Sequence, residues 1–300
     1  MELIKPGTNI DFIRYTKWAL LFSALLILMG LGSFWYHGGL NYGVDFAGGT
    51  VVQVRFNRPA NIADIRQALA TVNIANITVQ DLGQGGNEFL IRMPASETGS
   101  QDLSAQIQQA LTAKFGEQAF EVRRIETVGP RVGKDLRRKA LLAVLFATVM
   151  IGGYIAFRFE PRFGVGAAVA LVHDVLIAAG ALSLMNMEFD LTVVAALLTV
   201  IGFSVNDTVI VCDRIRENMR KMRRETLAAV INKSINETLS RTIITTGTAV
   251  LVIISLLVLG GEVIHAFAFA LLVGITIGTY SSIYVASPIV LLWAKEGWRR

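Results

Sequence analysis

The stretch LTVVAALLTVIGFSVNDTVIVC, residues 191–212, decides the fold of this chain. It runs for 22 residues and contains one charged side chain, Asp207. A helix needs roughly 17–25 apolar residues to cross about 30 Å of hydrocarbon, so this length is typical of a transmembrane helix and too long for a buried strand. The stretch therefore predicts a membrane span that carries an ionisable group.

Five further apolar runs lie on either side of it, and each is long enough to cross a bilayer. They cover residues 18–36, 140–157, 163–187, 242–261 and 263–294, the last of which exceeds a single span. We expect the first run to be an uncleaved helix, because it is longer than the roughly 7–15 apolar residues of a signal peptide. The chain is thus predicted to be a polytopic α-helical membrane protein with six transmembrane helices.

The overall composition agrees with this prediction. Of the 300 residues, 53% are hydrophobic and 17% are charged, whereas soluble domains average about 45–50% and about 25%. The single cysteine, Cys212, excludes a disulfide framework and a zinc site built from cysteines. A soluble enzyme, a disordered chain and a disulfide-rich secreted domain are all disfavoured.

Lysine and arginine residues predict the orientation of the helices, because they are enriched in cytoplasmic loops. With the N-terminus inside, 16 of the 28 Lys and Arg residues fall in the inner segments 1–17, 158–162, 213–241 and 295–300. The short opposite loops, near 185–190 and 260–262, contain none. Both termini are therefore expected in the cytoplasm, and the long segment between the first two helices is expected outside.

The outer segment, residues 37–138, is predicted to be an α+β domain. Apolar patterns at 50–56, 77–82, 88–93 and 120–128 indicate four strands, and helical spacing at 60–72 and 102–115 indicates two helices. The order β-α-β-β-α-β is the ferredoxin-like split βαβ pattern. The predicted organisation is then 1–36 with the cytoplasmic N-terminus and first helix, the extracytoplasmic domain 37–138, and 139–300 with helices two to six and a basic cytoplasmic loop at 213–241.

Charged groups inside the predicted spans are candidates for function, because a charge at the centre of a span costs roughly 2.5–3.5 kcal/mol on insertion scales. Asp207 lies within GFSVNDT at 202–208, and Arg241 begins the fifth span. One interpretation is a carboxylate that binds and releases a proton beside this cation. The other is a structural ion pair between helices four and five. Hydroxyl and amide groups on the same helices could bridge the two residues: Ser204, Asn206, Thr208, Thr245 and Thr246.

Asp174 lies near the middle of the third span, next to His173. No partner for this carboxylate is evident in the sequence, so we expect a structural role and keep a supporting role in proton transfer as the alternative. His173 is expected to pack or to form hydrogen bonds between helices, in preference to binding a metal.

The inner loop at 213–241 begins with DRIREN and stays basic through Arg224. Apolar residues then follow at helical spacing: Leu227, Val230, Ile231, Ile235 and Leu239. This pattern predicts an amphipathic helix on the cytoplasmic membrane surface. Its positive charge either fixes the topology or docks a partner. Nucleic-acid binding is not expected, because the basic residues adjoin membrane spans and lack interleaved aromatic residues.

The sequence contains no motif typical of an enzyme. The glycine-rich stretch GVDFAGGT at 43–50 lacks the GK[ST] of a phosphate-binding loop, and we expect it to form a tight turn into the first strand. The chain also lacks HExxH, GxSxG and Walker sequences. We therefore expect neither ATP hydrolysis nor a cofactor.

Several of these stretches together resemble the SecD/SecF family of protein-export membrane proteins, within the RND (resistance-nodulation-division) superfamily. The resemblance rests on GVDFAGGT at 43–50, VGPRVG at 128–133, HD at 173–174, GFSVNDT at 202–208, DRIREN at 213–218 and the segment 232–242, which ends in SRT. It covers essentially the whole chain. The outer segment is shorter than that of SecD subunits, which points to the SecF branch of the family.

The resemblance implies partners and an energy source. SecF subunits pair with SecD in the bacterial inner membrane, attach to the SecYEG channel together with YajC, and use the proton-motive force to promote preprotein export. The coupling ion would be the proton, with no other cofactor. The resemblance also implies that Asp207 and Arg241, which match an essential Asp and an Arg of the family, take part in proton transfer.

The mechanistic hypothesis is that protonation of Asp207 removes its attraction to Arg241, so that helices four and five shift and the outer domain tilts. One charge that crosses 100 mV supplies about 2.3 kcal/mol. Two alternatives from other classes stay open: a non-transporting assembly subunit with a structural ion pair, and a small-molecule RND exporter. The exporter is disfavoured, because such proteins usually carry more helices and two large outer loops in one chain.

Overall fold

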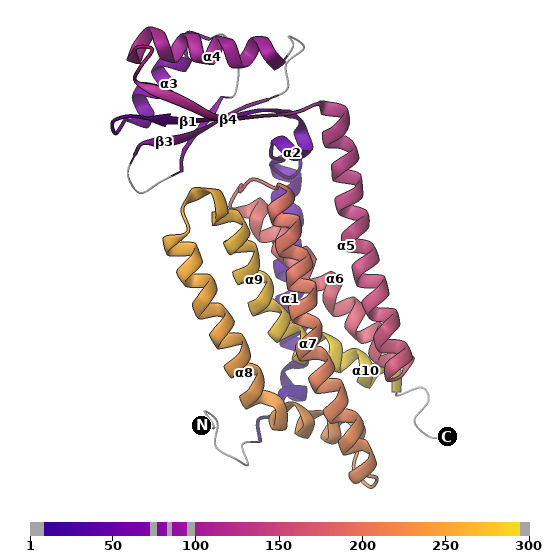
Figure 1. Ribbon diagram of the computed structural model, residues 1–300. Helices are drawn as coiled ribbons and strands as arrows, with labels where there is room; N and C mark the ends of the chain where they lie inside the picture. Colours follow the sequence, from indigo (N-terminus) through magenta and orange to yellow (C-terminus); the bar gives the residue numbers. More distant parts are fainter. Residues whose placement is uncertain (1–8, 73–76, 83–85, 95–99, 295–300) are drawn as a thin grey trace.

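The computed structural model describes residues 9–72, 77–82, 86–94 and 100–294. In this part of the chain, six helices are long and apolar enough to cross a membrane, which confirms the predicted number of spans. They are α1 (Phe12–Tyr36), α5 (Pro130–Arg158), α6 (Pro161–Leu184), α7 (Leu191–Lys221), α8 (Leu227–Leu259) and a last span that runs from α9 (His265–Ser281) through the π-helical turn η2 (Ser282–Ala286) into α10 (Ser287–Ala294). Figure 1 shows them as one bundle, with a small α/β domain at one end. The segments 1–8 and 295–300, which the sequence predicts to be cytoplasmic, lie outside the described residues.

Several of these helices extend beyond the apolar runs that predicted them, most of all α5, α7 and α8. Helix α5 begins at Pro130, where the missing N–H of proline costs nothing because a first helical position has no intrahelical acceptor. Helix α7 continues to Lys221 and α8 begins at Leu227. The predicted loop at 213–241 is therefore mostly helical, and it consists of the end of α7, a turn at 222–226 and the first turns of α8.

The amphipathic helix predicted on the membrane surface after Arg224 is present as a helix, but its apolar face packs against other helices of the bundle. The helical spacing is real, but these residues form the start of α8 and are continuous with the fifth span. Their apolar side chains are buried in a core shared with Val211 and Ile215 of α7 and Phe12 of α1. An apolar stripe with this spacing can face lipid or a neighbouring helix, and the sequence alone does not distinguish the two.

Small residues allow the membrane helices to approach closely. A Cβ atom on Gly30 of α1 would lie 2.7 Å from the Cα atom of Gly180 on α6. A Cβ atom on Gly278 of α9 would lie 2.9 Å from the Cβ atom of Ser204 on α7. Helices α6, α7 and α9 are the most buried spans, whereas α1, α5 and α8 leave much of their apolar surface exposed.

The described part of the α/β domain contains an antiparallel four-stranded sheet. Its strands are β1 (Gly49–Phe56), β2 (Thr78–Asp81), β3 (Glu88–Pro94) and β4 (Phe120–Val128), in the order β2-β3-β1-β4. Helices α3 (Ile62–Leu69) and α4 (Ser100–Phe115) lie on the side of the sheet away from the membrane helices (Figure 1). The core between sheet and helices includes Val52, Val54, Phe56, Ile65, Leu69, Phe89, Ile91, Ile107 and Leu111. The four strands and two helices predicted from the sequence are confirmed.

A short helix, α2 (Val44–Ala47), and two glycines connect α1 to the sheet. Gly48 and Gly49 have φ angles of +81° and +149°, which favour glycine over residues with a side chain. A Cβ atom on Gly49 would also lie 2.1 Å from the carbonyl oxygen of Met93 on β3. The predicted tight turn is confirmed, and the close approach explains why both positions are glycine.

Candidate functional site

Asp207 lies on α7 at the point where α7, α8 and α9 meet, and its side chain is fully buried. Its Oδ2 atom accepts hydrogen bonds from Thr279 of α9, at 3.2 Å, and from Thr246 of α8, at 3.4 Å. The two threonine hydroxyls lie 2.7 Å from each other. The Oδ1 atom is buried without a hydrogen-bond partner among the described residues. This carboxyl group therefore has one oxygen held by two neighbouring helices and one oxygen left for a proton.

Arg241 lies on α8 and is exposed. It lines a cavity of about 580 Å³ between α5, α7 and α8, at the end of the bundle away from the sheet, together with Asp213, Arg214, Glu217 and Glu237. Arg214 donates to Glu217 at 2.6 Å and to Glu237 at 2.7 Å. No ion pair joins Asp207 to Arg241 in the described part of the chain, so the direct contact expected from the sequence is not present in this structure.

The predicted bridging residues differ in what they contact. Thr246 binds Asp207, as described above. Ser204 donates to Asp174 instead, at 2.6 Å, and Thr208 donates to the backbone carbonyl of Ser204 at 3.1 Å. Thr245 donates to carbonyls of its own helix, and Asn206 is exposed. Thr279 is the residue that the sequence reasoning missed, although a hydroxyl inside an apolar span was the available signal.

Asp174 on α6 has partners that could not be seen in the sequence. It is fully buried, and its Oδ2 atom accepts from Ser204 of α7 at 2.6 Å and from Ser281 of α9 at 2.8 Å. Its Oδ1 atom lies 2.9 Å from Nδ1 of His173. The expectation that His173 forms hydrogen bonds between helices is confirmed, because its Nε2 atom lies 3.0 Å from the hydroxyl of Ser23 on α1.

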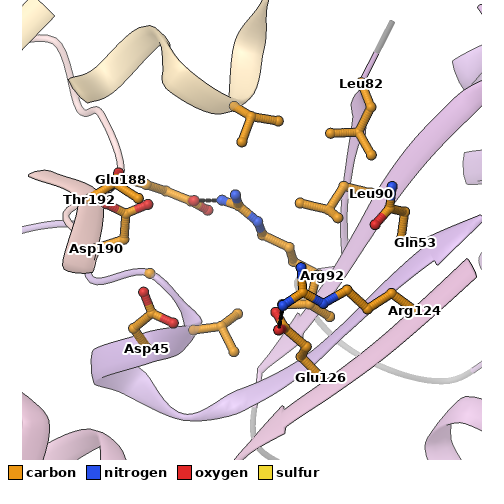
Figure 2. Close-up of a pocket in the computed structure, with 14 residues that line it drawn as sticks. Asp45, Gln53, Leu82, Leu90, Arg92, Arg124, Glu126, Glu188, Asp190 and Thr192 are labelled. Carbon is orange, nitrogen blue, oxygen red and sulfur yellow. Dashed lines mark hydrogen bonds and ion pairs between the residues drawn. The ribbon is translucent and has the colours of Figure 1, made fainter. Parts of the chain in front are cut away.

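A second cavity, of about 340 Å³, lies between the sheet and the membrane helices. Figure 2 shows Arg92 extending from β3 across this cavity to Glu188, in the loop between α6 and α7, where the two form an ion pair. Burial lowers the pKa of the Arg92 guanidinium from its ordinary value, and the carboxylates of Asp190 and Asp45 oppose this shift. The guanidinium stays protonated at neutral pH, because arginine side chains are effectively always protonated in proteins. The ion pair therefore ties the α/β domain to the bundle.

The two acidic residues beside Arg92 also hold the start of α7. Asp190 is the N-cap residue of this helix and accepts from the backbone N–H of Val193 at 2.9 Å. Asp45 of α2 accepts from the backbone N–H of Leu191 at 3.1 Å. Negative charge at a helix N-terminus is favourable, so the same cluster that holds the sheet also stabilises the helix that carries Asp207.

Six apolar helices with ionisable groups buried between them define a multi-pass membrane protein. Two family models place the chain further. The model described as "Protein export membrane protein SecD/SecF, C-terminal" matches residues 107–296, and the model described as "SecD/SecF GG Motif" matches residues 34–60. The chain belongs to the SecD/SecF family, and its role lies in protein export. The second match includes the glycine pair at the start of β1.

Relatives support this assignment over nearly the full length. The chain is 50% identical to the protein translocase subunit SecF of Magnetococcus marinus over 295 residues, which is 97% of this chain and 94% of the relative. It is 46% identical to the SecF subunit of Vibrio alginolyticus over 294 residues, which is 97% of this chain and 91% of that subunit. Both relatives are named as subunits of a protein translocase.

Solved structures of SecDF show the same fold. The crystal structure of SecDF from Thermus thermophilus, titled a translocon-associated membrane protein, matches with a TM-score of 0.81 and 38% identity over 96% of this chain. SecDF in a super-membrane-facing form matches with a TM-score of 0.72 and 39% identity over 99% of this chain. The chain spans 39% and 40% of the length of these two structures.

Proposed function

We propose that this chain is the SecF-type subunit of a complex that uses the proton-motive force to promote preprotein export. Full-length relatives named as translocase subunits support this proposal. We propose SecD, the SecYEG channel, YajC and the translocating preprotein as protein partners, with no role for nucleic acid. The exposed apolar faces of α1, α5 and α8 offer surface both to SecD and to lipid.

We propose that residues 37–138 form a ferredoxin-like domain on the outer side of the membrane and that both termini lie in the cytoplasm. The strand order β2-β3-β1-β4, with every neighbouring pair antiparallel, supports the first part. The excess of Lys and Arg in the segments at the opposite end of the bundle supports the second. The domain then faces a preprotein as it leaves the channel.

The observation that carries the coupling mechanism is the setting of Asp207, which is buried at 0% exposure with one oxygen atom unpartnered. An ionised carboxylate in this setting is costly, and a proton on Oδ1 removes the charge. When the proton leaves, the charge on Asp207 attracts the guanidinium of Arg241. Arg241 lies one to two helical turns before Thr246 on α8, so α7 and α8 shift relative to each other. The separation of Asp207 from Arg241 in this structure fits the protonated state, in which nothing draws the cation inward.

The proposal requires neither a cofactor nor a catalytic residue, because the proton itself is the coupling ion. Each charge that crosses 100 mV supplies about 2.3 kcal/mol. This energy is comparable to that of a few hydrogen bonds between transmembrane helices. Thr246 and Thr279 orient the carboxyl group, and Ser204 acts on the neighbouring carboxylate of Asp174. Asn206 and Thr208 are left with a supporting role in the packing and hydration of α7.

The test is Asp207→Asn in the complete complex with SecD, reconstituted in vesicles with the channel and its ATPase. Asparagine keeps the shape of the side chain and its contacts with the two threonines but cannot ionise. We expect the export stimulated by a proton gradient to be lost, while gradient-independent export remains. The matched control is Asp135→Asn on α5, whose carboxylate is 57% exposed and paired with Lys139 at 2.8 Å, and which we expect to have no effect.

The competing proposal is an assembly subunit in which Asp207 has a structural role. It predicts that Asp207→Asn lowers the amount of SecD that copurifies and lowers export equally with and without a gradient. Survival of gradient-stimulated export in this variant, with a complex of normal composition, would refute the proton-coupling mechanism.

A further inference from the structure

We infer that His173 and Asp174 form a second proton-binding site within the membrane, and that this pair positions Asp207 through helices α7 and α9. The site itself follows from hydrogen-bond geometry alone. Its role in export rests on the proposed function, because it acts on the carboxyl group to which that proposal assigns the coupling proton.

The pair lies in a continuous chain of hydrogen bonds that crosses three helices. Asp174 and His173 of α6 are 0% and 6% exposed. His173 Nδ1 lies 2.9 Å from Asp174 Oδ1, and His173 Nε2 lies 3.0 Å from the hydroxyl of Ser23 on α1. The Ser23 hydroxyl lies 3.1 Å from that of Tyr280 on α9, which donates to the backbone carbonyl of Ala19. This series of hydrogen bonds therefore ends at the carbonyl oxygen of Ala19, which can only accept a hydrogen bond.

This fixed end determines where the protons are, because a hydroxyl group has only one to donate. Tyr280 uses its proton on Ala19, so Ser23 is the donor in its contact with Tyr280. Ser23 then has no proton for His173, and Nε2 of His173 must be the donor in that contact. Two arrangements remain: a protonated Nδ1 facing a carboxylate, or a bare Nδ1 facing a protonated Asp174. Both place one proton between His173 and Asp174, so the structure corresponds to the proton-loaded pair.

Release of this proton would change the whole chain of hydrogen bonds. A neutral His173 would donate from Nδ1 to the Asp174 carboxylate, and its Nε2 atom would become an acceptor. Ser23 would then turn its proton toward His173 and away from Tyr280, so α1 and α9 would lose a contact. The pair would also carry a net negative charge. The network thus has two distinct arrangements that differ by one proton.

The other titratable groups around the pair do not supply a fixed countercharge. The ring of Tyr280 stacks on His173 with a centroid distance of 6.3 Å, and the ring of Tyr284 lies 5.1 Å beyond it. On α7 the nearest titratable side chain along the helix is Asp207. Helices α1 and α5, which also pack on α6, carry their charged residues near their ends. The charge of the pair is therefore set by its own proton.

Asp174 and Asp207 are linked through α7, which carries Asp207, and through α9, which donates hydrogen bonds to both. Asp174 accepts from Ser204 of α7 and Ser281 of α9. Ser204 precedes Asp207 by three residues, about 4.5 Å along the helix axis, and Ser281 follows Thr279, the donor to Asp207, by two residues. Where the shared proton lies on Asp174, its release ionises this carboxyl group. Hydrogen bonds to an ionised group are about twice as strong as neutral ones, so release from that arrangement would draw α7 and α9 toward α6. This movement would change the surroundings of Asp207.

The local packing suits such a transfer of movement. A Cβ atom on Gly278 would lie 3.1 Å from the hydroxyl oxygen of Ser204, so α7 and α9 are closely packed at this point. The π-helical turn Ser282–Ala286 begins directly after Ser281. Irregular turns of this kind often mark functional positions in helices, because they allow a change of register without unfolding.

The proton site can be tested without any export assay. The chain has three histidines, so nitrogen-15 labelling of histidine in this subunit alone, assembled with unlabelled SecD, gives few signals, and His173→Gln assigns the one of interest. We expect the His173 ring in lipid at neutral pH to show a protonated Nε2 and a proton shared at Nδ1. In Ser23→Ala the Nε2 signal should shift while the Nδ1 signal stays. A neutral ring with a bare Nε2 across the whole pH range would overturn the proposal.

The positioning role is tested by the pH profile of gradient-stimulated export. We expect Asp174→Asn to move the midpoint of this profile by about one pH unit, equivalent to a tenfold change in proton affinity, and Asp174→Glu to restore it in part. Ser204→Ala is a milder variant that should shift the profile while the His173 ring keeps a protonated Nε2. Variants are compared only where SecD copurifies normally.

The outcomes separate this proposal from the one on which it rests. If the His173 signals are as expected but neither Asp174→Asn nor Ser204→Ala moves the profile, the positioning role is wrong. If export by the unmodified complex does not respond to a proton gradient, the proposed function fails, whereas the histidine signals still decide whether the pair binds a proton.

Discussion

The ion pair between Arg92 and Glu188 predicts an asymmetric response to mutation. In Arg92→Gln the cation is removed and three carboxylates, those of Glu188, Asp190 and Asp45, face one another across the cavity. In Glu188→Gln the cation remains and still has two carboxylates nearby. We therefore expect Arg92→Gln to weaken the contact between sheet and bundle more than Glu188→Gln does.

The size of the effect follows from burial. The side chains of Arg92 and Glu188 are 14% and 25% exposed, so the pair is partly screened by water. Removing one partner of a fully buried pair costs roughly 3–5 kcal/mol, and exposed pairs are worth about 0–1 kcal/mol. We expect about 1.4 kcal/mol for Glu188→Gln and about 2–3 kcal/mol for Arg92→Gln, which correspond to roughly tenfold and roughly 30- to 150-fold changes in the opening equilibrium.

Hydrogen exchange of two backbone amides measures this opening directly. Gly43 donates to the carbonyl of Phe189 at 3.0 Å, and Phe189 donates to the carbonyl of Asn41 at 2.7 Å, so both amides are protected only while the contact between these two segments is closed. Exchange of these amides is compared between the unmodified chain and the two variants, in the complex with SecD. Exchange of the same amides in the double variant, which carries both Arg92→Gln and Glu188→Gln, completes a double-mutant cycle. The cycle gives the coupling energy of the ion pair.

A matched control lines the same cavity. Arg124 of β4 pairs with Glu126, but these side chains are 66% and 50% exposed, so Arg124→Gln should change exchange by less than about fivefold. The reasoning is refuted if Arg92→Gln has no larger effect than Arg124→Gln, or if Glu188→Gln has the larger effect of the two main variants.

Two glycine contacts give further predictions, each with a matched control. Gly49→Ala forces a Cβ atom to 2.1 Å from a backbone oxygen at positive φ, and should lower the melting temperature of the complex far more than Gly38→Ala, where φ is +70° but nothing lies within 4 Å. Equal shifts for both variants would show that φ strain alone matters. Gly278→Ala should cost about 1–3 kcal/mol by overpacking against Ser204, whereas Gly202→Ala, with nothing within 4 Å, should be nearly neutral. A neutral Gly278→Ala would mean that α7 and α9 can separate freely.

The sequence predicts the elements well because each depends on local information. The length of the apolar run at 191–212 is enough to indicate a span, and apolar alternation in Thr50–Phe56 is enough to indicate a strand with one buried face. The turn at Gly48 and Gly49 can be predicted because glycine adopts positive φ angles without steric cost. Even the error at the start of α8 has a local cause, since the same spacing describes a helix on lipid and a helix in a bundle.

The partners of the buried charges could not be predicted in the same way. Asp174 is bound by hydroxyls that are 30 and 107 residues away in sequence, and Arg92 pairs with a glutamate on another element entirely. Nothing in the local pattern of a span shows which hydroxyl of a distant helix will face it. For Arg241 the sequence led to a contact that is not present. Its position suggested a direct contact with Asp207, which the helix geometry does not provide.

Helix α7 connects all the charged sites of the molecule. It begins at the acidic cluster that holds Arg92, passes Ser204 and Asp207, and ends in the cavity that contains Arg241, about 46 Å away for a helix of 31 residues. Two of the residues around Arg92 also bind the first turn of α7. Under the proposed function, a displacement of α7 on protonation of Asp207 therefore acts on the contact between the α/β domain and the bundle, because the same helix takes part in both.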